Sequence, residues 1–512
     1  MLDSSKDNKR IAKNTLLLYI RMIFTMLISL YTSRLVLNTL GITDYGIYNV
    51  VGGIISLLGF ITSSLGGASS RYLTFELGKG NINKLKKTFG NILSIHILFS
   101  IAILILGETI GLWFFYNKLQ IPIERFDAAF WVYQFSIFTS IVSFISIPYN
   151  AVIIAHEKMS AFAYISIIDV ILKLLIVYLL LIIPYDKLII YSIFFFCIQF
   201  FDRIIYGIYC SKHFEETHAR LRIDKNLFKE LFSFAFWTMG GNLACIGYTQ
   251  GLNILLNIFF GPAINAARGI AVQVQNIVSN FCLNFQTAIN PQITKNYANK
   301  DLTQMHTLVQ ISSKYSFLLL YLISLPLILE APIVLKWWLG IVPEHTINFL
   351  RIILCTSLIV SLSNPLVISI YATGNIKKFQ IIEGSILLCI VPIAYISLKY
   401  YGVSPEIVFL IHFLIELITQ VVRIRLVLPA IKMKQQIYYR GTIIPIIKVV
   451  LASSIIPLLA YYYLQPNFFS FLLMCIICVT SILMTTYFLG CNPQEKIYII
   501  NKLKIITNKI KN

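Results

Sequence analysis

The chain has 512 residues, of which 57% are hydrophobic and only 12% are charged. Soluble globular domains carry about 25% charged residues, so this composition excludes an ordinary soluble protein. The net charge of +20 is attributed to membrane topology and contact with anionic lipids rather than to nucleic-acid binding. The apolar residues form segments of roughly 20 or more residues, the length that an α-helix needs to cross a bilayer. The sequence therefore indicates an all-α polytopic membrane protein.

Clusters of Gly, Pro and charged residues divide the apolar sequence into fourteen expected transmembrane helices. Their ranges are 12–38, 45–76, 88–116, 127–154, 160–184, 188–210, 231–259, 266–290, 311–335, 346–372, 380–398, 406–428, 442–464 and 468–489. If the N-terminus is inside, about 29 Lys and Arg fall in inner loops and about 5 in outer loops. This asymmetry predicts that both termini are cytoplasmic.

An internal repeat divides the chain into two halves. The stretch "LVLNTLGITDYG" at 35–46 is echoed about 220 residues later by "ILLNIFFGPAINAA" at 254–267, and Glu108 and Pro148 have counterparts in Glu330 and Pro365. Three matches in the same order predict two pseudo-symmetric six-helix lobes, a plan that places a substrate site between halves. We expect an N-lobe over 1–210, a cytoplasmic linker over 211–230, a C-lobe over 231–428, two extra helices within 442–489 and a basic cytoplasmic tail over 490–512.

The first copy of the repeat contains two residues that suit the connection between the first two spans. Gly41 is expected to let the chain reverse, and Asp44 is expected to cap the second helix through its carboxylate.

Polar side chains share one face on the first, second, seventh and eighth expected spans. We expect them to line a central cavity for an anionic, sugar-bearing ligand, because guanidinium groups bind phosphate oxygens and amides and hydroxyls match sugar hydroxyls. The alternatives are that the neutral residues only join helices and that Arg34 and Arg268 extend to lipid headgroups. The candidate cavity residues are Arg21, Thr25, Ser29, Arg34, Arg71, Asn242, Asn253, Arg268, Gln275 and Gln286.

Acidic residues within the expected spans are candidates for carrying a coupling proton or cation. The candidates are Asp169, Glu108, Glu330, Glu383 and Glu416. The alternative for each is a buried or interfacial ion pair. Asp169 has Lys173 four residues later, and Asp202 is adjacent to Arg203, so both aspartates are also candidates for local pairs.

Sequence motifs for catalysis are absent. There is no GxxxxGK[ST] loop, no HExxH, no GxSxG and no DxD pair for the metal ion of a sugar nucleotide. The histidines occur singly, which favours packing over metal ligation. The longest expected outer loop, about a dozen residues, is too short for a folded catalytic domain. We therefore expect a transporter and not an enzyme, with no cofactor and no metal site.

Several stretches of the chain, taken with the fourteen spans, resemble a known family. They are "LGITDYGIYNVV", "LFSFAFWTMGGNLA", "ILLNIFFGPAINAARGIAVQV" and "AINPQITKNYA". They look like bacterial polysaccharide-unit flippases, the O-antigen and capsule exporters of the multidrug/oligosaccharidyl-lipid/polysaccharide exporter superfamily, over about residues 8 to 490. The resemblance implies a V-shaped pair of lobes in the bacterial cytoplasmic membrane. It further implies that alternating access moves undecaprenyl-diphosphate-linked oligosaccharide to the outer leaflet.

The resemblance also implies functional residues and partners. In similar lipid II flippases, arginines on the first and eighth helices line the cavity, and Arg21 or Arg34, and Arg268, match them in placement. The two extra helices favour the lipid-linked branch, where they form a hydrophobic groove. The expected partners are the lipid-linked oligosaccharide, membrane lipids and the polysaccharide polymerase and chain-length machinery, with the protein itself a monomer. The alternative is a cation-coupled drug or small-solute antiporter of the same superfamily.

Overall fold

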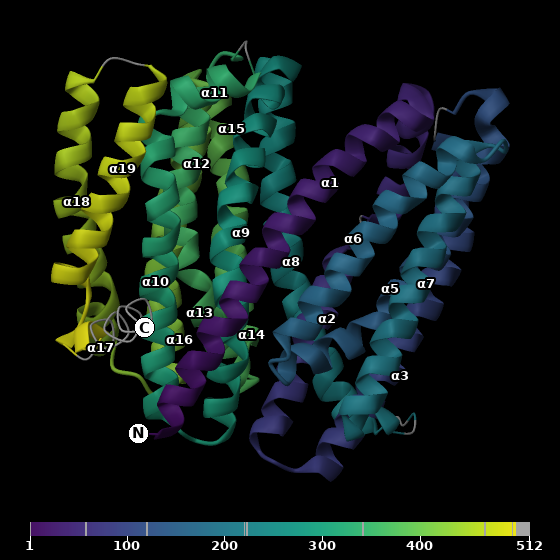
Figure 1. The fold of residues 1–512 in the computed structure, drawn as a ribbon, viewed down its shortest axis with the longest axis horizontal. Coiled ribbons are helices and arrows are strands. Elements are labelled where there is room, and N and C mark those ends of the chain that lie inside the picture. The colour runs from purple at the N-terminus through teal and green to yellow at the C-terminus, as the bar shows by residue number, and fades with distance from the viewer. Residues whose placement is uncertain are drawn as a thin grey trace, which may run out of the picture. The chain divides into compact units, whose positions relative to one another are not determined.

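The computed structural model describes residues 2–56, 59–118, 121–219, 221, 224–339, 342–464, 467–493 and 495–497. Within these ranges all regular structure is helical and no strand occurs, which confirms the all-α prediction (Figure 1). The chain divides into two compact units. Unit 1 comprises Met1–Leu243 and Thr287–Asp301, and unit 2 comprises Ala244–Gln286 and Leu302–Asn512. The predicted lobe, linker and tail boundaries remain predictions.

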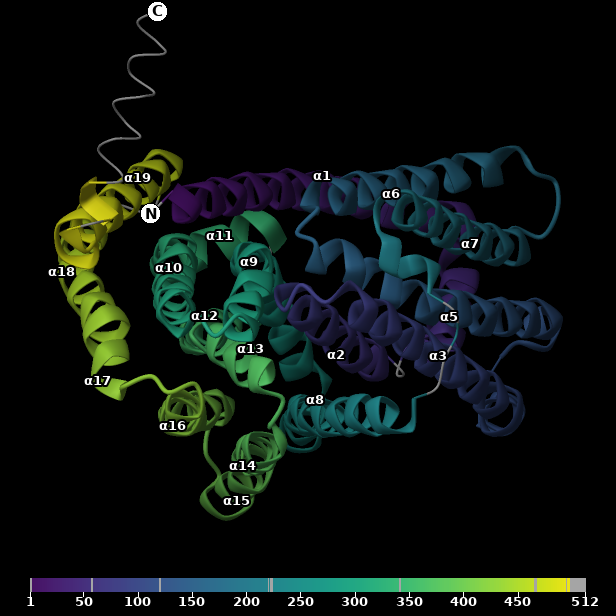
Figure 2. The ribbon, with the colours of Figure 1, turned by 90° about the horizontal axis from the view of Figure 1, so that it is seen from below.

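In the described residues, unit 1 is built from six long α-helices, one short α-helix and parts of two more. They are α1 (Leu2–Ser56), α2 (Gly59–Gly78), α3 (Ile82–Leu106), α4 (Leu112–Lys118), α5 (Phe126–Ala155), α6 (Met159–Ile182), α7 (Lys187–His213), α8 (Lys225–Phe260) as far as Leu243, and the end of α9 (Pro262–Ala298) from Thr287. Helix α5 packs against α2, α3 and α7, and α1 packs against α6. Figure 2 shows α1 and α6 running side by side in this unit.

The long helix α1 is interrupted at a glycine. Gly41 has φ 79° and ψ 170°, a conformation that only a residue without a Cβ adopts without strain, so two helical segments meet there. This agrees with the expected break after the first span. Asp44, in the second segment, accepts hydrogen bonds from Arg125 Nε at 2.8 Å and Arg125 Nη2 at 2.5 Å.

Unit 2 contains the remaining helices. They are the end of α8, most of α9, α10 (Leu302–Leu329), α11 (Ala331–Leu339), α12 (Thr346–Ser361), α13 (Ser363–Thr373), α14 (Lys377–Leu388), α15 (Ile390–Tyr401), α16 (Pro405–Ala430), α17 (Gln435–Tyr438), α18 (Ile444–Tyr463) and α19 (Phe468–Thr485). Helices α10, α12, α13 and α16 pack around a hydrophobic core that includes Phe349 and Leu354. Helices α18 and α19 pair with each other beside α10, as Figure 2 shows.

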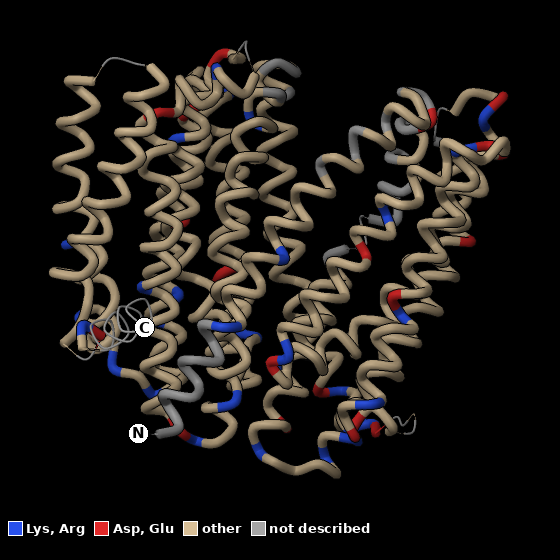
Figure 3. The backbone as a smooth tube through the Cα atoms, viewed as in Figure 1, with Lys and Arg blue, Asp and Glu red and all other residues tan. Residues whose placement is uncertain are grey.

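Eleven helical segments in the described part of the chain are long and apolar enough to cross a membrane. They coincide with the third to seventh and the ninth to fourteenth predicted spans. The first predicted span falls within α1 and the eighth within α9, and the second covers the end of α1 and most of α2. In each unit, Lys and Arg gather toward the lower ends of the helices in the view of Figure 3, and the middles of the helices hold few charges. The chain is therefore a multi-pass membrane protein.

Candidate functional site

A polar cavity lies inside unit 1, between α5, α6 and α7. Its volume is about 220 Å³. The wall is formed by Ser143, Ser146, Ile147 and Asn150 of α5, Ile165, Ser166 and Asp169 of α6, and Gln199, Asp202 and Tyr206 of α7. Eight of these ten side chains carry an oxygen, because only the two isoleucines are apolar. We call this the unit 1 cavity.

Two carboxylates and one ammonium group set the charge of the unit 1 cavity. Lys173 Nζ lies 2.9 Å from Asp169 Oδ2 and 2.8 Å from Asp169 Oδ1, so the predicted pair four residues apart on α6 is present. Asp202 lies beside Asp169. Two oxygen atoms of the cavity wall, Asp202 Oδ1 and Asn150 Oδ1, are among the buried atoms that have no hydrogen-bond partner in the described chain. The cavity therefore presents unsatisfied oxygen atoms, and it has two carboxyl groups near one ammonium group.

The expected pair between Asp202 and Arg203 is not among the salt bridges of the described residues. The Arg203 guanidinium instead lies 3.9 Å from the ring centroid of Tyr149. Consecutive residues on an α-helix point about 100° apart, so neighbours in sequence do not face each other. Asp202 consequently faces the cavity and α6.

The predicted cavity arginines occupy different environments. Arg21 on α1 lies over the ring of Phe162 at 4.6 Å. Arg71 on α2 is 8% exposed and lies within 5.4 Å of the rings of Tyr72, Phe75 and Phe234. The side chain of Arg34 is outside the described part of the structure.

Arg268 on α9 donates to Asn253 Oδ1 at 3.3 Å and to Thr249 O at 3.1 Å, both on α8. Asn253 and Arg268, both predicted from the sequence, are therefore in contact within unit 2. Since both acceptors are neutral, these hydrogen bonds leave the charge of the guanidinium available to an anion.

The neutral residues of the predicted set form hydrogen bonds within their own units. Asn242 Nδ2 donates to Ser64 Oγ at 2.8 Å, which links α8 to α2 in unit 1. Gln275 donates to Ser357 Oγ at 2.8 Å, and the buried Gln286 donates to Ser316 Oγ at 3.0 Å and Ser361 O at 2.9 Å, all in unit 2. Thr25 Oγ1 donates to Met22 O at 3.2 Å, and Ser29 is exposed. Their predicted contacts with a ligand remain predictions.

The other coupling candidates are separate from the unit 1 cavity. Glu108 lies in a short π-helical turn, Gly107–Gly111, and accepts a long hydrogen bond of 3.4 Å from Gln134. Glu330 is buried at the junction between α10 and α11. Glu383 on α14 accepts a 2.5 Å hydrogen bond from Arg423 Nε.

Some polar residues of the unit 1 cavity and of the interior of unit 2 were not identified from the sequence. Gln199 and Tyr206 on α7 complete the cavity wall, and Arg423 on α16 occupies the polar interior of unit 2. The spacing of seven residues between Glu416 and Arg423 was an available signal, because residues i and i+7 lie on the same face of a helix.

Comparison with solved structures shows which fold this is. The chain superposes on an outward-facing multidrug resistance MATE family transporter of the MOP superfamily with a TM-score of 0.72 at 14% identity, covering 84% of this chain and 97% of that one. A MOP superfamily transporter from Pyrococcus furiosus, described as having a reversed polarity of its binding pocket, gives a TM-score of 0.69 at 14% identity, covering 84% and 97%. The MATE transporter ClbM in complex with Rb⁺ gives 0.65 at 12% identity, again covering 84% and 97%. The fold is therefore that of MOP superfamily transporters.

The family follows from the sequence. A model of the polysaccharide biosynthesis protein family matches residues 11–297, more than half of the chain. The chain belongs to this family, so it is a membrane transporter or flippase of the polysaccharide biosynthesis family with a MOP superfamily fold. A comparison with curated proteins finds no match.

Proposed function

We propose that this protein is a flippase that moves undecaprenyl-diphosphate-linked oligosaccharide units from the cytoplasmic to the outer leaflet of the bacterial cytoplasmic membrane, by alternating access. The supporting observation is that a chain of the polysaccharide biosynthesis family has the fold of transporters. Saccharide hydroxyls would lose their hydrogen bonds to water in the hydrocarbon core, so a saccharide needs a protein path. The exported units serve O-antigen or capsule biosynthesis, with the protein acting as a monomer beside the polymerase and chain-length machinery.

Arg268 in unit 2 is proposed to bind the diphosphate, and Arg21 in unit 1 is a second candidate for a phosphate contact. Arg268 supports this role because its hydrogen-bond acceptors in the described chain, Asn253 and the Thr249 carbonyl, carry no charge. A half-buried guanidinium that faces only neutral acceptors binds an anion favourably, since its own charge is not yet compensated. The prenyl chain remains in lipid or lies against α18 and α19, whose outward residues include the exposed Leu451 and Ile476.

The test is export of surface polysaccharide in a deletion strain that carries variants. Arg268→Ala is expected to lower export by roughly 30-fold, because loss of hydrogen bonds to a charged ligand costs about 2 kcal/mol. Arg268→Lys retains the charge without the bidentate geometry, so its export is expected to lie between that of the natural protein and that of Arg268→Ala. Arg440→Ala, an exposed arginine in the turn before α18, is the matched control. Normal export by Arg268→Ala at an equal membrane protein level would contradict the cationic-site proposal.

Energy coupling is proposed at the unit 1 cavity. Two carboxylates that share a low-dielectric site with one ammonium are stabilised by a further proton or monovalent cation. The unpaired Asp202 Oδ1 and Asn150 Oδ1 supply oxygen ligands. The solved structure of ClbM with Rb⁺ shows that a protein of this fold binds a monovalent cation. Asp202→Asn is expected to abolish cation- or proton-driven transport, whereas Asp127→Asn on the exposed first turn of α5 should not.

A cation-coupled antiporter for drugs or small solutes is the second candidate. The MATE transporters of the same fold favour it, including one described as a multidrug resistance transporter. Drug susceptibility separates the two proposals. Deletion of a flippase causes lipid-linked saccharide to accumulate on the cytoplasmic side with unchanged susceptibility, whereas deletion of a drug antiporter changes susceptibility alone.

The proposed orientation places both termini in the cytoplasm. The supporting observation is that Lys and Arg gather toward one end of the helices in each unit (Figure 3). A fluorescent protein that folds only in the cytoplasm, fused after residue 512, should fluoresce. A periplasmically active phosphatase at the same place should be inactive.

A further inference from the structure

Each unit contains a pair of carboxylates, and the two pairs occupy matching positions of the predicted repeat. Asp169 and Asp202 lie on α6 and α7, the fifth and sixth spans of the first half. Glu383 and Glu416 lie on α14 and α16, within the fifth and sixth spans of the second half. The separation between counterparts is identical, since 383 − 169 and 416 − 202 both give 214. This agreement indicates that the pairs are equivalent sites of the two six-helix halves.

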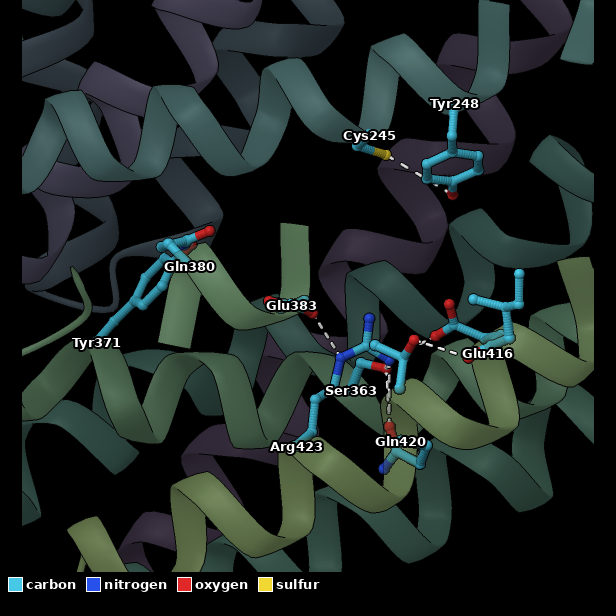
Figure 4. A network of polar contacts seen from close by, with 11 residues as sticks. Cys245, Tyr248, Ser363, Tyr371, Gln380, Glu383, Glu416, Gln420 and Arg423 are labelled. Carbon is cyan, nitrogen blue, oxygen red and sulfur yellow. Dashed lines mark hydrogen bonds and ion pairs between the residues drawn. The ribbon is translucent and has the colours of Figure 1, made fainter. Parts of the chain in front are cut away.

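In unit 2 the acid pair is bridged by a single guanidinium. Arg423 Nε donates to Glu383 Oε1 at 2.5 Å, and Arg423 Nη1 donates to Glu416 Oε1. The side chains of Arg423 and Glu416 are 6% and 2% exposed, so the bridge is shielded from water. Figure 4 shows Arg423 between the two glutamates.

Neutral oxygens complete the surroundings of this guanidinium. Arg423 Nη1 donates to Ser363 Oγ at 2.7 Å and to Gln420 Oε1 at 3.3 Å. Four oxygen atoms from α13, α14 and α16 therefore surround Arg423 (Figure 4). Carboxylate, hydroxyl and amide oxygens are also the ligands that hard cations prefer in proteins.

In unit 1 the corresponding pair is not bridged in this way. Lys173 hydrogen bonds to Asp169, whereas Asp202 Oδ1 has no hydrogen-bond partner in the described chain. This pair also borders a cavity of about 220 Å³. A proton or a small cation thus has both space and unsatisfied oxygen atoms at the unit 1 pair.

We infer that the Glu383–Glu416 pair is a cation site that Arg423 fills permanently, so that only the Asp169–Asp202 pair exchanges a proton or monovalent cation. The inference rests on the coupling proposed above. A covalently tethered cation cannot dissociate, so the unit 2 site contributes stability but no ion movement. Arg423 thereby determines which half of the transporter is coupled to an ion gradient.

Other titratable groups near the unit 2 pair bear on its test. His412 precedes Glu416 by one helical turn, and its ring centroid is 5.1 Å from that of Tyr248 on α8. Glu416 also lies within electrostatic range of Cys245 on α8, and His412 lies within range of Arg268 on α9. Near the unit 1 pair, the corresponding groups are Lys173, Tyr206 and, through Tyr206, Arg21. The variants below leave all of these residues unchanged.

The test uses the purified full-length protein in lipid nanodiscs, without oligosaccharide. Thermal unfolding is measured in NaCl, LiCl or KCl against choline chloride at equal ionic strength, and over a pH series. Arg423→Gln retains polar contacts but removes the cation. It is expected to melt several degrees lower in choline chloride at neutral pH and to regain stability, saturably, with a small monovalent cation or with falling pH. The double variant Glu383→Gln/Arg423→Gln should lose most of this gained response, and Arg423→Lys should behave like the natural protein.

An Arg423→Gln variant with no response beyond that of the natural protein would overturn the inference. If Arg423→Gln does not fold, Asp202→Asn keeps the inference testable, because it should remove the saturable response to monovalent cations in a chain that retains Arg423. If Asp202→Asn still responds to a monovalent cation, and the added change Glu383→Gln abolishes that response, the inference is also wrong. These readouts are independent of export, so a wrong assignment of the transported substrate leaves them unchanged. A natural protein that lacks any cation or proton response would instead contradict the coupling proposal.

Discussion

Unit 1 has an ionic cluster at each end of α5, and the two differ mainly in their exposure. Glu157 lies two residues after the last residue of α5, and Arg125 immediately precedes the first. A helix of 30 residues places the two clusters about 45 Å apart. The side chain of Glu157 is fully buried, whereas the side chains of Asp44, Arg125 and Asp186 are 18%, 27% and 31% exposed. Because burial changes the energy of breaking an ion pair, we expect the two clusters to stabilise the ends of α5 by different amounts.

The buried cluster joins three segments that are far apart in sequence. Glu157 Oε1 accepts a hydrogen bond from Lys295 Nζ at 2.7 Å, and Oε2 accepts one from Gln292 at 3.2 Å. Asn14 on α1 donates to the Glu157 carbonyl at 3.1 Å. The end of α9 is thereby held to the turn between α5 and α6 and to the start of α1. Any transport step that moves α9 relative to these segments has to break a buried ion pair.

The largest loss of stability is expected for Glu157→Ala. It leaves the Lys295 ammonium in a mostly buried site without its carboxylate, and breaking a buried pair in this way costs about 3–5 kcal/mol. Thermal unfolding in nanodiscs and proteolysis of the 287–301 segment measure the loss. Glu124→Ala, an exposed glutamate before α5, is the matched control. Equal stability of the two variants would show that the buried ion pair of Glu157 and Lys295 does not stabilise this end of α5.

The origin of that loss is separable by a double variant. Glu157→Gln/Lys295→Met removes both charges and retains the amide and the apolar stem, so it should recover part of the stability. Recovery would assign the loss to the unpaired charge. No recovery would assign it to packing around the turn, where Glu157 has a positive φ of 57°.

A smaller loss of stability is expected from Gly78→Val. This change acts where the end of α9 packs, close to Lys295, and it alters no charge. A Cβ at Gly78 would lie 3.0 Å from both Ala298 Cβ and Lys295 O, so the end of α9 approaches α2 too closely for a side chain. Overpacking of this kind costs about 1–3 kcal/mol. Cleavage of the 287–301 segment should accelerate relative to Gly67→Val, since a Cβ at Gly67 meets no atom within 4 Å. Equal cleavage rates would contradict the close approach.

The fold was predictable to a greater extent than these clusters. Spans such as Met159–Ile182 are continuous apolar runs, and length plus composition are sufficient to place them. The pair of Asp169 and Lys173 was also predictable, because both residues lie on one helix four positions apart. Local spacing therefore identified this pair, although it missed the pair of Glu416 and Arg423 on α16.

Contacts between distant segments were not predictable in the same way. Glu157 and Lys295 are 138 positions apart, and neither has a local sequence signal that names its partner. Arg423 was overlooked although it shares a helix face with Glu416, because its second partner, Glu383, lies on another helix. Asp202 faces Asp169 and not the adjacent Arg203, since tertiary packing selects among the partners of a buried charge. One sequence without homologues does not contain this information.

At the exposed end, Arg125→Gln is expected to cost about 1 kcal/mol, less than either change at the buried end. Arg125 contacts Asp44 through Nε at 2.8 Å and Asp186 through Nη1 at 2.5 Å. Its removal leaves two carboxylates facing each other, but water screens them. The difference in melting temperature from the natural protein should shrink at high salt. Lys300→Gln, an exposed lysine, is the control. A salt-independent loss as large as that of Glu157→Ala would abolish the distinction between the two ends.

The smallest expected change in stability is the one that pH causes at the exposed cluster, which consists of Asp44, Arg125 and Asp186. Partial burial acts to raise the pKa of Asp186, but hydrogen bonds from Arg125 and from the backbone N–H groups of Ile189 and Leu188 outweigh it and lower the pKa. A lowered folded-state pKa means that the stabilisation is complete above the unfolded value of about 3.9 and is lost as the pH falls through the folded value. The melting-temperature difference between the natural protein and Asp186→Asn should therefore narrow as the pH falls from about 6 to about 3.

The same measurement in an Arg125→Gln background shows where the pH dependence originates. If Arg125 is the main charged partner, the narrowing should be much weaker there, because the backbone N–H groups alone hold the carboxylate. If the melting-temperature difference narrows just as much without Arg125, the pH dependence comes from the Asp186 cap of α7. Asp186 would then act as a helix cap rather than as part of an ionic link between segments.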